Sequence, residues 1–171
     1  MESTLTKNRI SKKRSFVKLG FSKLEAVEIV NSLNQLLADY SVHYQKLRNF
    51  HWNVTGSDFF DIHEKFEEQY NVTKVAVDDI AERIRIFGLH PFSTMLEFIE
   101  NSHLKEVGND FPADKMVTEI INDYEILLEQ MFNVLDMAIE HGDSGTEDMI
   151  KEFIKYTEKN HWMMSSFLTE K

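Results

Sequence analysis

Long stretches of the sequence repeat their apolar residues with helical spacing, and few residues interrupt them. The 171 residues include only two prolines and six glycines, the residue types that most strongly break helices. The apolar period predicts four long helices, over about residues 22–52, 59–87, 113–141 and 146–168. No segment alternates convincingly between apolar and polar side chains as a half-buried strand does, so we expect an all-α fold.

Residues at the ends of these segments support the helix boundaries. Ser22 followed by Glu25 matches a capping box, and Asp58 is placed to cap the second helix. Gly88, shortly before Pro91, ends that helix. The stretch from 142 to 145, Gly-Asp-Ser-Gly, is expected to separate the last two helices.

The connection between the two prolines carries one short apolar pattern, Met95, Leu96, Phe98 and Ile99. We expect a short helix there, within a crossover that lets the second and third long helices run parallel, as in bundles with one crossover. No repeat or second domain is visible. The domains predicted are a basic arm, residues 1–20, and a four-helix bundle, residues 21–171.

Charge is distributed unevenly between the arm and the bundle. Residues 1–20 contain six basic residues and one acidic residue, Glu2, so their net charge is +5. Because the whole chain has a net charge of −10, the remaining residues carry −15. An acidic body repels nucleic acid, whereas a basic arm can contact phosphates. The basic residues of the arm are Lys7, Arg9, Lys12, Lys13, Arg14 and Lys18.

The composition restricts the chemistry. The chain has no cysteine, which excludes disulfides, thiolate zinc sites and cysteine-ligated iron–sulfur clusters. Any metal must be held by His, Asp and Glu, which suit iron, manganese or zinc. There is no apolar run of the length that spans a bilayer and no apolar signal segment, so we expect no membrane partner and a cytoplasmic protein.

The second predicted helix places His63, Glu67, Asp78 and Glu82 on one face, at about 0°, 40°, 60° and 100° around its axis. Its length separates the first from the last by about 28 Å, so one metal ion cannot contact both ends. The four positions are symmetric about the point between Val72 and Thr73. An antiparallel copy related by a two-fold axis at that point would complete two equivalent sites.

His51, at the end of the first helix, lies across a short loop from His63 and is expected to join it. His51, His63 and Glu67 of one chain, with Asp78 and Glu82 of another, would form a site suited to Fe(II). The alternative is that these are ordinary surface or capping groups. Trp52 is either a redox-active neighbour of the site or a residue that fills the core.

A different metal site has to be weighed, because di-iron bundle proteins use Glu-x-x-His on two helices. The chain has this spacing at Glu100/His103 and at Glu158/His161. The first pair falls in the short segment between the prolines, and the first and third helices show no obvious inward glutamates. We therefore favour the site shared between chains.

The segments HWNVTGSDFFDIHEKFEE, residues 51–68, and DDIAERIRIFG, residues 78–88, closely resemble the signature of the Dps family, the DNA-protection-during-starvation ferritins. The shared features are two histidines twelve residues apart, the Asn-Val-x-Gly loop and the Asp-x-x-x-Glu-Arg end. EKNHWMMSSFL, residues 158–168, is similar to the last helix of the family.

The resemblance implies a ferritin-like bundle in a hollow homododecamer that oxidises Fe(II), preferably with hydrogen peroxide, and stores ferric mineral, protecting DNA. It implies that His51, His63 and Glu67 bind iron together with Asp78 and Glu82 of the neighbouring subunit. Glu67 stands where many members have Asp, so the charge at the second iron position is kept but the side chain is longer. The family's acidic three-fold pores make Asp143, Glu147 and Asp148 pore candidates.

Two other functions compete with the ferroxidase. One is a nucleoid protein that binds DNA through many copies of the basic arm, with iron chemistry secondary; some family members bind DNA in this way and others do not. The other is a helical assembly without metal chemistry. No phosphate-binding loop, Ser-His-Asp order or nucleotide fingerprint supports a kinase or a hydrolase.

Overall fold

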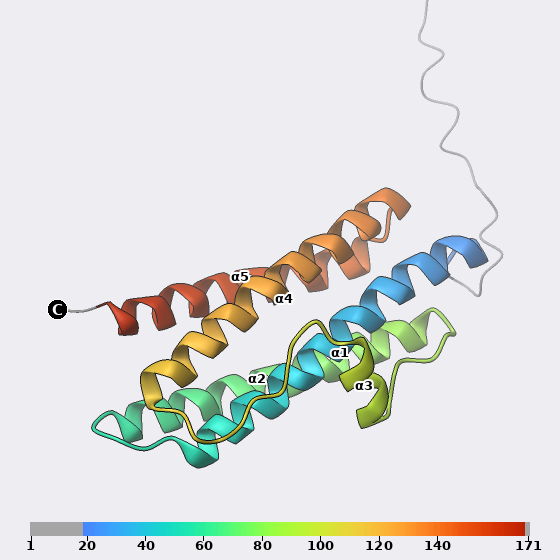
Figure 1. Ribbon diagram of the computed structural model, residues 1–171. Coiled ribbons are helices and arrows are strands. Elements are labelled where there is room, and N and C mark those ends of the chain that lie inside the picture. The colour runs from blue at the N-terminus through green and yellow to red at the C-terminus, as the bar shows by residue number, and fades with distance from the viewer. Residues whose placement is uncertain (1–18, 170–171) are drawn as a thin grey trace, which may run out of the picture.

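The computed structural model describes residues 19–169, and these residues form helices without a β-strand ladder (Figure 1). The predicted all-α class and the short helix in the crossover are both confirmed. The basic residues at positions 7–18 lie outside the described residues. The helices are α1 (Lys23–Asn53), α2 (Phe59–Ile86), α3 (Met95–Asn101), α4 (Ala113–His141) and α5 (Ser144–Leu168).

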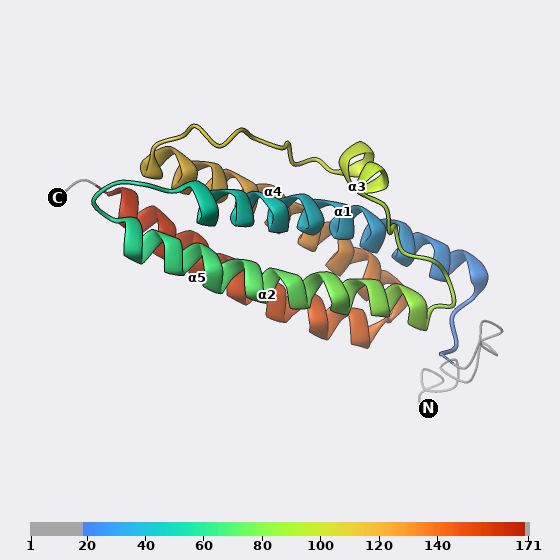
Figure 2. The same cartoon turned by 90° about the horizontal axis from the view of Figure 1, so that it is seen from below.

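The four long helices form two antiparallel pairs, α1 with α2 and α4 with α5, and the pairs meet where α1 packs on α4. The crossover runs along the outside of the bundle and holds α3 against α1 (Figures 1 and 2). Because of this long connection, α2 and α4 run in the same direction, as the sequence predicts. None of the described helices is long and apolar enough to cross a membrane.

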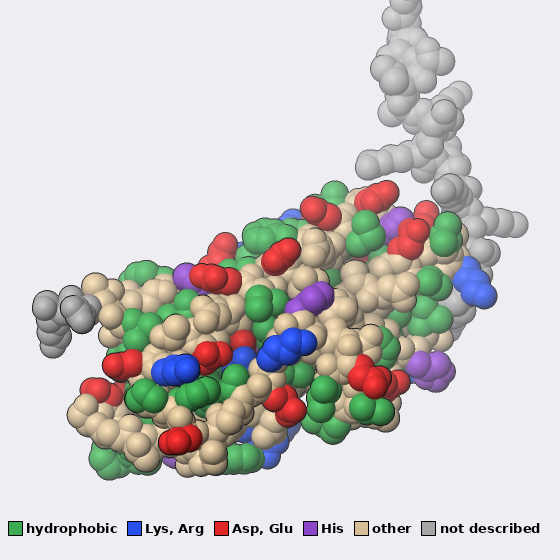
Figure 3. Space-filling view, viewed as in Figure 1, with side chains coloured by type: hydrophobic (Ala, Val, Ile, Leu, Met, Phe, Trp, Pro, Cys, Tyr) green, Lys and Arg blue, Asp and Glu red, His purple; other side chains and the backbone are tan. Residues whose placement is uncertain are grey.

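The core is built from the apolar face of each long helix. Leu33, Phe66, Ile120 and Ile150 are fully buried and come from four different helices. Complete burial of such a side chain contributes about 1.5–3 kcal/mol. Acidic side chains are spread over the outer face seen in Figure 3, in keeping with the acidic charge of the bundle.

The helix ends agree only partly with the predicted caps. The capping box is confirmed, because Ser22 N donates to Glu25 Oε2 at 2.7 Å and Glu25 N donates to Ser22 Oγ at 3.3 Å. Asp58 occupies the N-cap position of α2, but its side chain makes no capping hydrogen bond; it accepts instead from Ser57 Oγ at 2.9 Å. The prediction that the Asp58 side chain caps α2 is therefore wrong.

The turn between α4 and α5 is shorter than predicted. Gly142 ends α4 with a φ of 69°, a left-handed conformation that glycine adopts without strain. Asp143 then caps α5 by accepting from Thr146 N at 3.2 Å. This cap lets α5 begin at Ser144 rather than at the predicted Thr146.

Candidate metal centre

His51 and His63 meet where α1 ends and α2 begins. The loop between the two helices contains Gly56, whose φ of 117° favours glycine, and its Val54 is buried in the core. The loop brings the two imidazole rings into a stack with their centroids 3.8 Å apart and their planes 23° apart. Phe59 stacks on the other side of His63 at 4.9 Å, so aromatic contacts fix both histidines.

A reciprocal pair of hydrogen bonds orients the two rings. His51 Nδ1 lies 2.9 Å from the backbone oxygen of His63, and His63 Nδ1 lies 2.8 Å from the backbone oxygen of His51. A carbonyl oxygen only accepts hydrogen bonds, so each Nδ1 carries the proton and donates it. In a neutral ring, a proton on Nδ1 leaves the lone pair on Nε2, which is the state in which histidine binds a metal.

Glu67, one turn after His63 on α2, adds a carboxylate to the two histidines. One ligand atom from each of the three side chains lies within 4.8 Å of the others. In residues 19–169 this is the one group of three or more such side chains with this arrangement. Two imidazole nitrogens and an exposed carboxylate suit Fe(II), Mn(II) or Zn(II), and the role of the group as metal ligands stays a prediction.

Tyr70 holds the carboxylate from one further turn along α2. Its hydroxyl donates to Glu67 Oε1 at 3.3 Å, and its ring contacts His51 edge-on at 5.3 Å. Desolvation, followed by the charge of the Glu67 carboxylate, raises the pKa of Tyr70. The phenol therefore remains a protonated donor.

Asp78 and Glu82 lie further along α2, and both are exposed. The structure does not bring them into the group formed by the two histidines and Glu67. One chain thus supplies a site with a single carboxylate at one end of α2 and two unused carboxylates towards the other.

The two Glu-x-x-His pairs do not form a comparable group in the described part of the chain. His103 Nδ1 lies 3.1 Å from the buried carboxylate of Asp39, and His161 Nε2 lies 3.6 Å from Glu125 on α4. Glu100 and Glu158 are both exposed. The intrachain alternative therefore lacks a set of ligands.

The core holds a charged group that the sequence did not predict, formed by His43, Lys46 and Asp123. Asp123 Oδ1 accepts from Lys46 Nζ at 2.5 Å, and Asp123 Oδ2 lies 2.9 Å from His43 Nδ1. All three side chains are buried. A signal was available, because Asp123 falls between the apolar positions Ile120 and Leu127 of its helix.

Trp52, next to the predicted metal site, and Asp143, a predicted pore residue, differ from the prediction in how exposed they are. Trp52 is 57% exposed and lies under Arg48 at 4.7 Å, so the interpretation that it fills the core is wrong. Asp143 is 2% exposed and pairs with Arg83, which also donates to Thr146 Oγ1 at 2.9 Å.

This pairing turns Asp143 inward and leaves Glu147 and Asp148 as the pore candidates. The Arg83 guanidinium passes so close to Gly145 that a Cβ there would lie 2.9 Å from it.

The family model for the ferritin-like domain matches residues 30–171. General stress protein 20U of Bacillus subtilis is 38% identical over 82% of this chain and 97% of its own length. DNA protection during starvation protein 2 of Bacillus anthracis is 38% identical over 84% of this chain and 98% of its own length. The chain belongs to the Dps family of ferritin-like proteins.

Solved Dps structures agree with this assignment. Dps of Vibrio cholerae O1, described as a member of the ferritin-like diiron-carboxylate superfamily, matches with a TM-score of 0.88 and 31% identity, over 93% of this chain and 100% of that one. Dps of Staphylococcus aureus matches with a TM-score of 0.81 and 39% identity, over 84% and 96%. Membership of the Dps family supports iron binding, iron storage and DNA protection, and suggests an oligomer.

Proposed function

We propose that the protein is a ferroxidase that oxidises Fe(II), preferably with hydrogen peroxide, and stores the ferric product as mineral inside a hollow homododecamer. The observation that carries the proposal is the group formed by His51, His63 and Glu67. Its imidazoles are oriented with free Nε2 atoms, and its ligand atoms are close enough to hold one ion. Iron is the substrate of the reaction and the cargo of the assembly.

The chemistry follows from the donors. Oxygen donors stabilise Fe(III) relative to Fe(II), so carboxylates favour loss of the electron. When two Fe(II) ions each give one electron to the same peroxide, the O–O bond breaks and two hydroxide ions form. No hydroxyl radical is released by this two-electron step, and both reagents that generate the radical are consumed. Removal of these reagents would protect DNA.

A second copy of the chain is proposed to complete the site through its Asp78 and Glu82. The two-fold axis would pass near Val72 and Thr73, where α2 of the partner runs antiparallel. The outer face of α2 is apolar for a surface helix, with Phe60 80% exposed and Val75 58% exposed, and such a face favours contact with another chain. Light scattering should give about 240 kDa for twelve chains of 20.1 kDa.

The ferroxidase is tested by anaerobic addition of Fe(II) followed by peroxide, with ferric absorbance recorded over time. We expect fast oxidation by the unmodified protein and loss of the fast phase in His51→Ala/His63→Ala. The matched control is His103→Ala/His161→Ala, which removes the histidines of both Glu-x-x-His pairs and should keep the fast phase. Equal rates in all three proteins would refute the assignment.

The shared site is tested by mixing two inactive chains. His51→Ala/His63→Ala keeps the acidic half of each site, and Asp78→Ala/Glu82→Ala keeps the histidine half. In a mixed isologous pair one of the two sites is intact, so random co-assembly at equal amounts should restore about one quarter of the sites. Activity that stays at the level of the separate variants would show that the two halves do not combine across chains.

Binding of DNA through the N-terminal arm is a second candidate, favoured by the charge of +5 on residues 1–20. Multiple arms on one particle would bind duplex DNA by multivalency, with a steep dependence on salt. Gel shifts across a salt series, with the full chain and with a chain that starts at residue 21, test this candidate. A full chain that gives no shift at low salt would eliminate it.

A further inference from the structure

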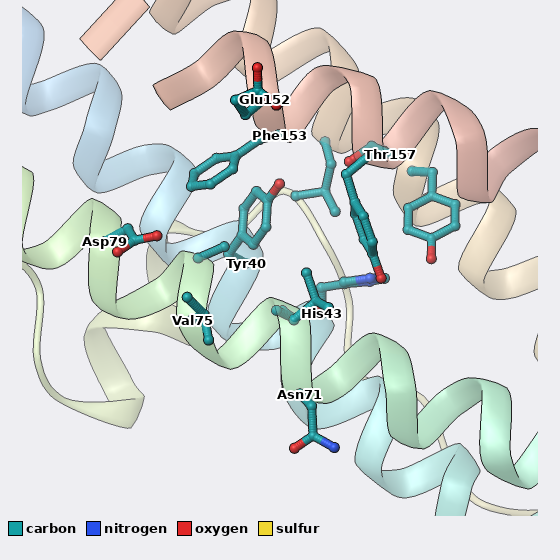
Figure 4. A pocket seen from close by; sticks show the side chains of 14 residues that line it. Tyr40, His43, Asn71, Val75, Asp79, Glu152, Phe153 and Thr157 are labelled. Atoms are coloured by element: carbon teal, nitrogen blue, oxygen red, sulfur yellow. The ribbon is translucent and has the colours of Figure 1, made fainter. Parts of the chain in front are cut away.

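A cavity of about 450 Å³ lies between α2 and α5, with α1 and α4 behind it (Figure 4). It is distinct from the metal centre, whose histidines and glutamate do not line it. Its volume is within the range of pockets that hold small organic ligands. Its lining comes from all four long helices and includes Tyr40, His43, Val72, Asp79, Tyr124 and Glu152.

The walls of the cavity are largely aromatic and aliphatic. Tyr40 and Phe153 form one tilted ring pair, with centroids 5.8 Å apart, and Tyr124 lies against His43 at 5.4 Å. Flat aromatic walls favour a planar ring as a ligand, because offset and edge-on ring contacts add to the burial of apolar surface.

Two hydroxyls in this wall, those of Tyr124 and Tyr156, are buried and make no hydrogen bond. Tyr124 is only 3% exposed, and its hydroxyl makes no hydrogen bond. Most buried polar groups are hydrogen-bonded, and an unpaired one costs free energy. Burial raises the pKa of Tyr124 well above its usual value, so the hydroxyl remains a neutral donor and requires an acceptor.

The charges around the cavity restrict the ligand further. The lining contains no Lys or Arg, while the exposed carboxylates of Asp79 and Glu152 stand on α2 and α5 at its edges (Figure 4). His43 is the one histidine in the lining, and its Nδ1 lies 2.9 Å from Asp123 Oδ2. Lys155 lies 2.7 Å from Glu152 and offsets its charge, but an anion would still meet the carboxylate of Asp79 and no Lys or Arg in the lining, so an anionic ligand is disfavoured.

We propose that this cavity binds a neutral, planar aromatic molecule of two or three rings that carries a carbonyl oxygen or ring nitrogen, which accepts a hydrogen bond from Tyr124. The cavity and the metal centre are neighbours, since Asn71, which also lines the cavity, follows Glu67 by one helical turn on α2. Val72 lies at the two-fold axis proposed above, so the binding experiment uses the assembled protein.

Coumarin, a neutral two-ring compound with a carbonyl acceptor, is the probe, and binding is measured by calorimetry and by saturation-transfer NMR. Naphthalene has the same two-ring shape without an acceptor, and coumarin-3-carboxylate adds a negative charge. We expect saturable binding of coumarin and at least about tenfold weaker binding of the carboxylate. An assembled protein that does not bind coumarin refutes the proposal.

Two variants locate the site. Tyr124→Phe removes only the Tyr124 hydroxyl, so it should weaken coumarin about five- to tenfold and leave naphthalene unchanged. Ala76→Phe places a ring in the cavity and should abolish binding of both compounds, with thermal unfolding and light scattering confirming that the variant folds and assembles. Coumarin binding that is unchanged in Tyr124→Phe, or retained in Ala76→Phe, would overturn the assignment.

Discussion

Two histidine-centred groups lie about two turns apart on α1 and differ in how their hydrogen bonds are used. In the core, His43 and Lys46 both contact Asp123, and the opposite charges are paired within the protein. At the end of the helix, His51 Nδ1 donates to the backbone carbonyl of His63. His51 Nε2 makes no hydrogen bond within the described residues.

The difference separates a group that stabilises the fold from a group that can bind a ligand. Both oxygens of the buried Asp123 carboxylate already have partners, and removal of one member leaves the others unpaired in a medium of low dielectric constant. The group of His51, His63 and Glu67 is oriented by backbone atoms and by ring stacking, so its ligand atoms remain available. Variants in the core should therefore alter stability, and variants at the helix end should alter metal binding.

The largest effect is expected for Asp123→Leu, which leaves Lys46 and His43 buried without their carboxylate. We expect a loss of about 3–5 kcal/mol in the free energy of unfolding, measured by urea unfolding at a fixed protein concentration. Lys46→Met/Asp123→Leu replaces both charged groups by apolar ones and should recover part of that loss. A loss below about 1 kcal/mol for the single variant would show that the core group is not a structural ion pair.

The ion pair of Arg83 and Asp143 is intermediate between a fully buried pair and an exposed one, because the Arg83 side chain is 16% exposed while Asp143 is buried. Arg83→Ala removes the bonds to Asp143 and Thr146, so a loss of about 1–3 kcal/mol is expected in the same urea experiment. Arg85→Ala, an exposed arginine on the same helix, is the control and should change stability by less than about 0.5 kcal/mol. Equal effects for both would contradict a specific role for Arg83.

The helices and the proximity of His51, His63 and Glu67 could be predicted from the sequence because both depend on local spacing, whereas the role of the three residues as metal ligands stays a prediction. The helical period placed His63 and Glu67 on one face, and the short loop after Asn53 brought His51 to them. Packing between helices was not predictable in the same way. Nothing local indicates that Asp123 on α4 meets Lys46 on α1.

Exposure was also predicted incompletely. Leu24 is an apolar residue within the first predicted helix, residues 22–52, but it is 68% exposed. Trp162 belongs to the apolar pattern of α5 and is also exposed. A periodic pattern identifies apolar positions, but whether another helix covers each position depends on the tertiary fold and on the assembly.

At the helix end, Glu67→Gln should reduce metal affinity without affecting stability. It removes the only negative charge among the three donors of one chain, so affinity for Zn(II), a redox-silent probe, should fall about tenfold. Calorimetry measures the affinity, and Glu64→Gln, an exposed glutamate in the same turn, is the matched control. Equal Zn(II) affinity in the two variants would remove Glu67 from the proposed site.

Tyr70→Phe should give the smallest change, a loss of Zn(II) affinity of about two- to threefold. Groups that orient a metal ligand often contribute more, but this bond is 3.3 Å long and its carboxylate is exposed, which reduces its value. If Tyr70 acts by holding the carboxylate, the substitution should have no further effect in a Glu67→Ala chain. A similar loss in both backgrounds would mean that Tyr70 acts through its edge-on contact with His51 instead.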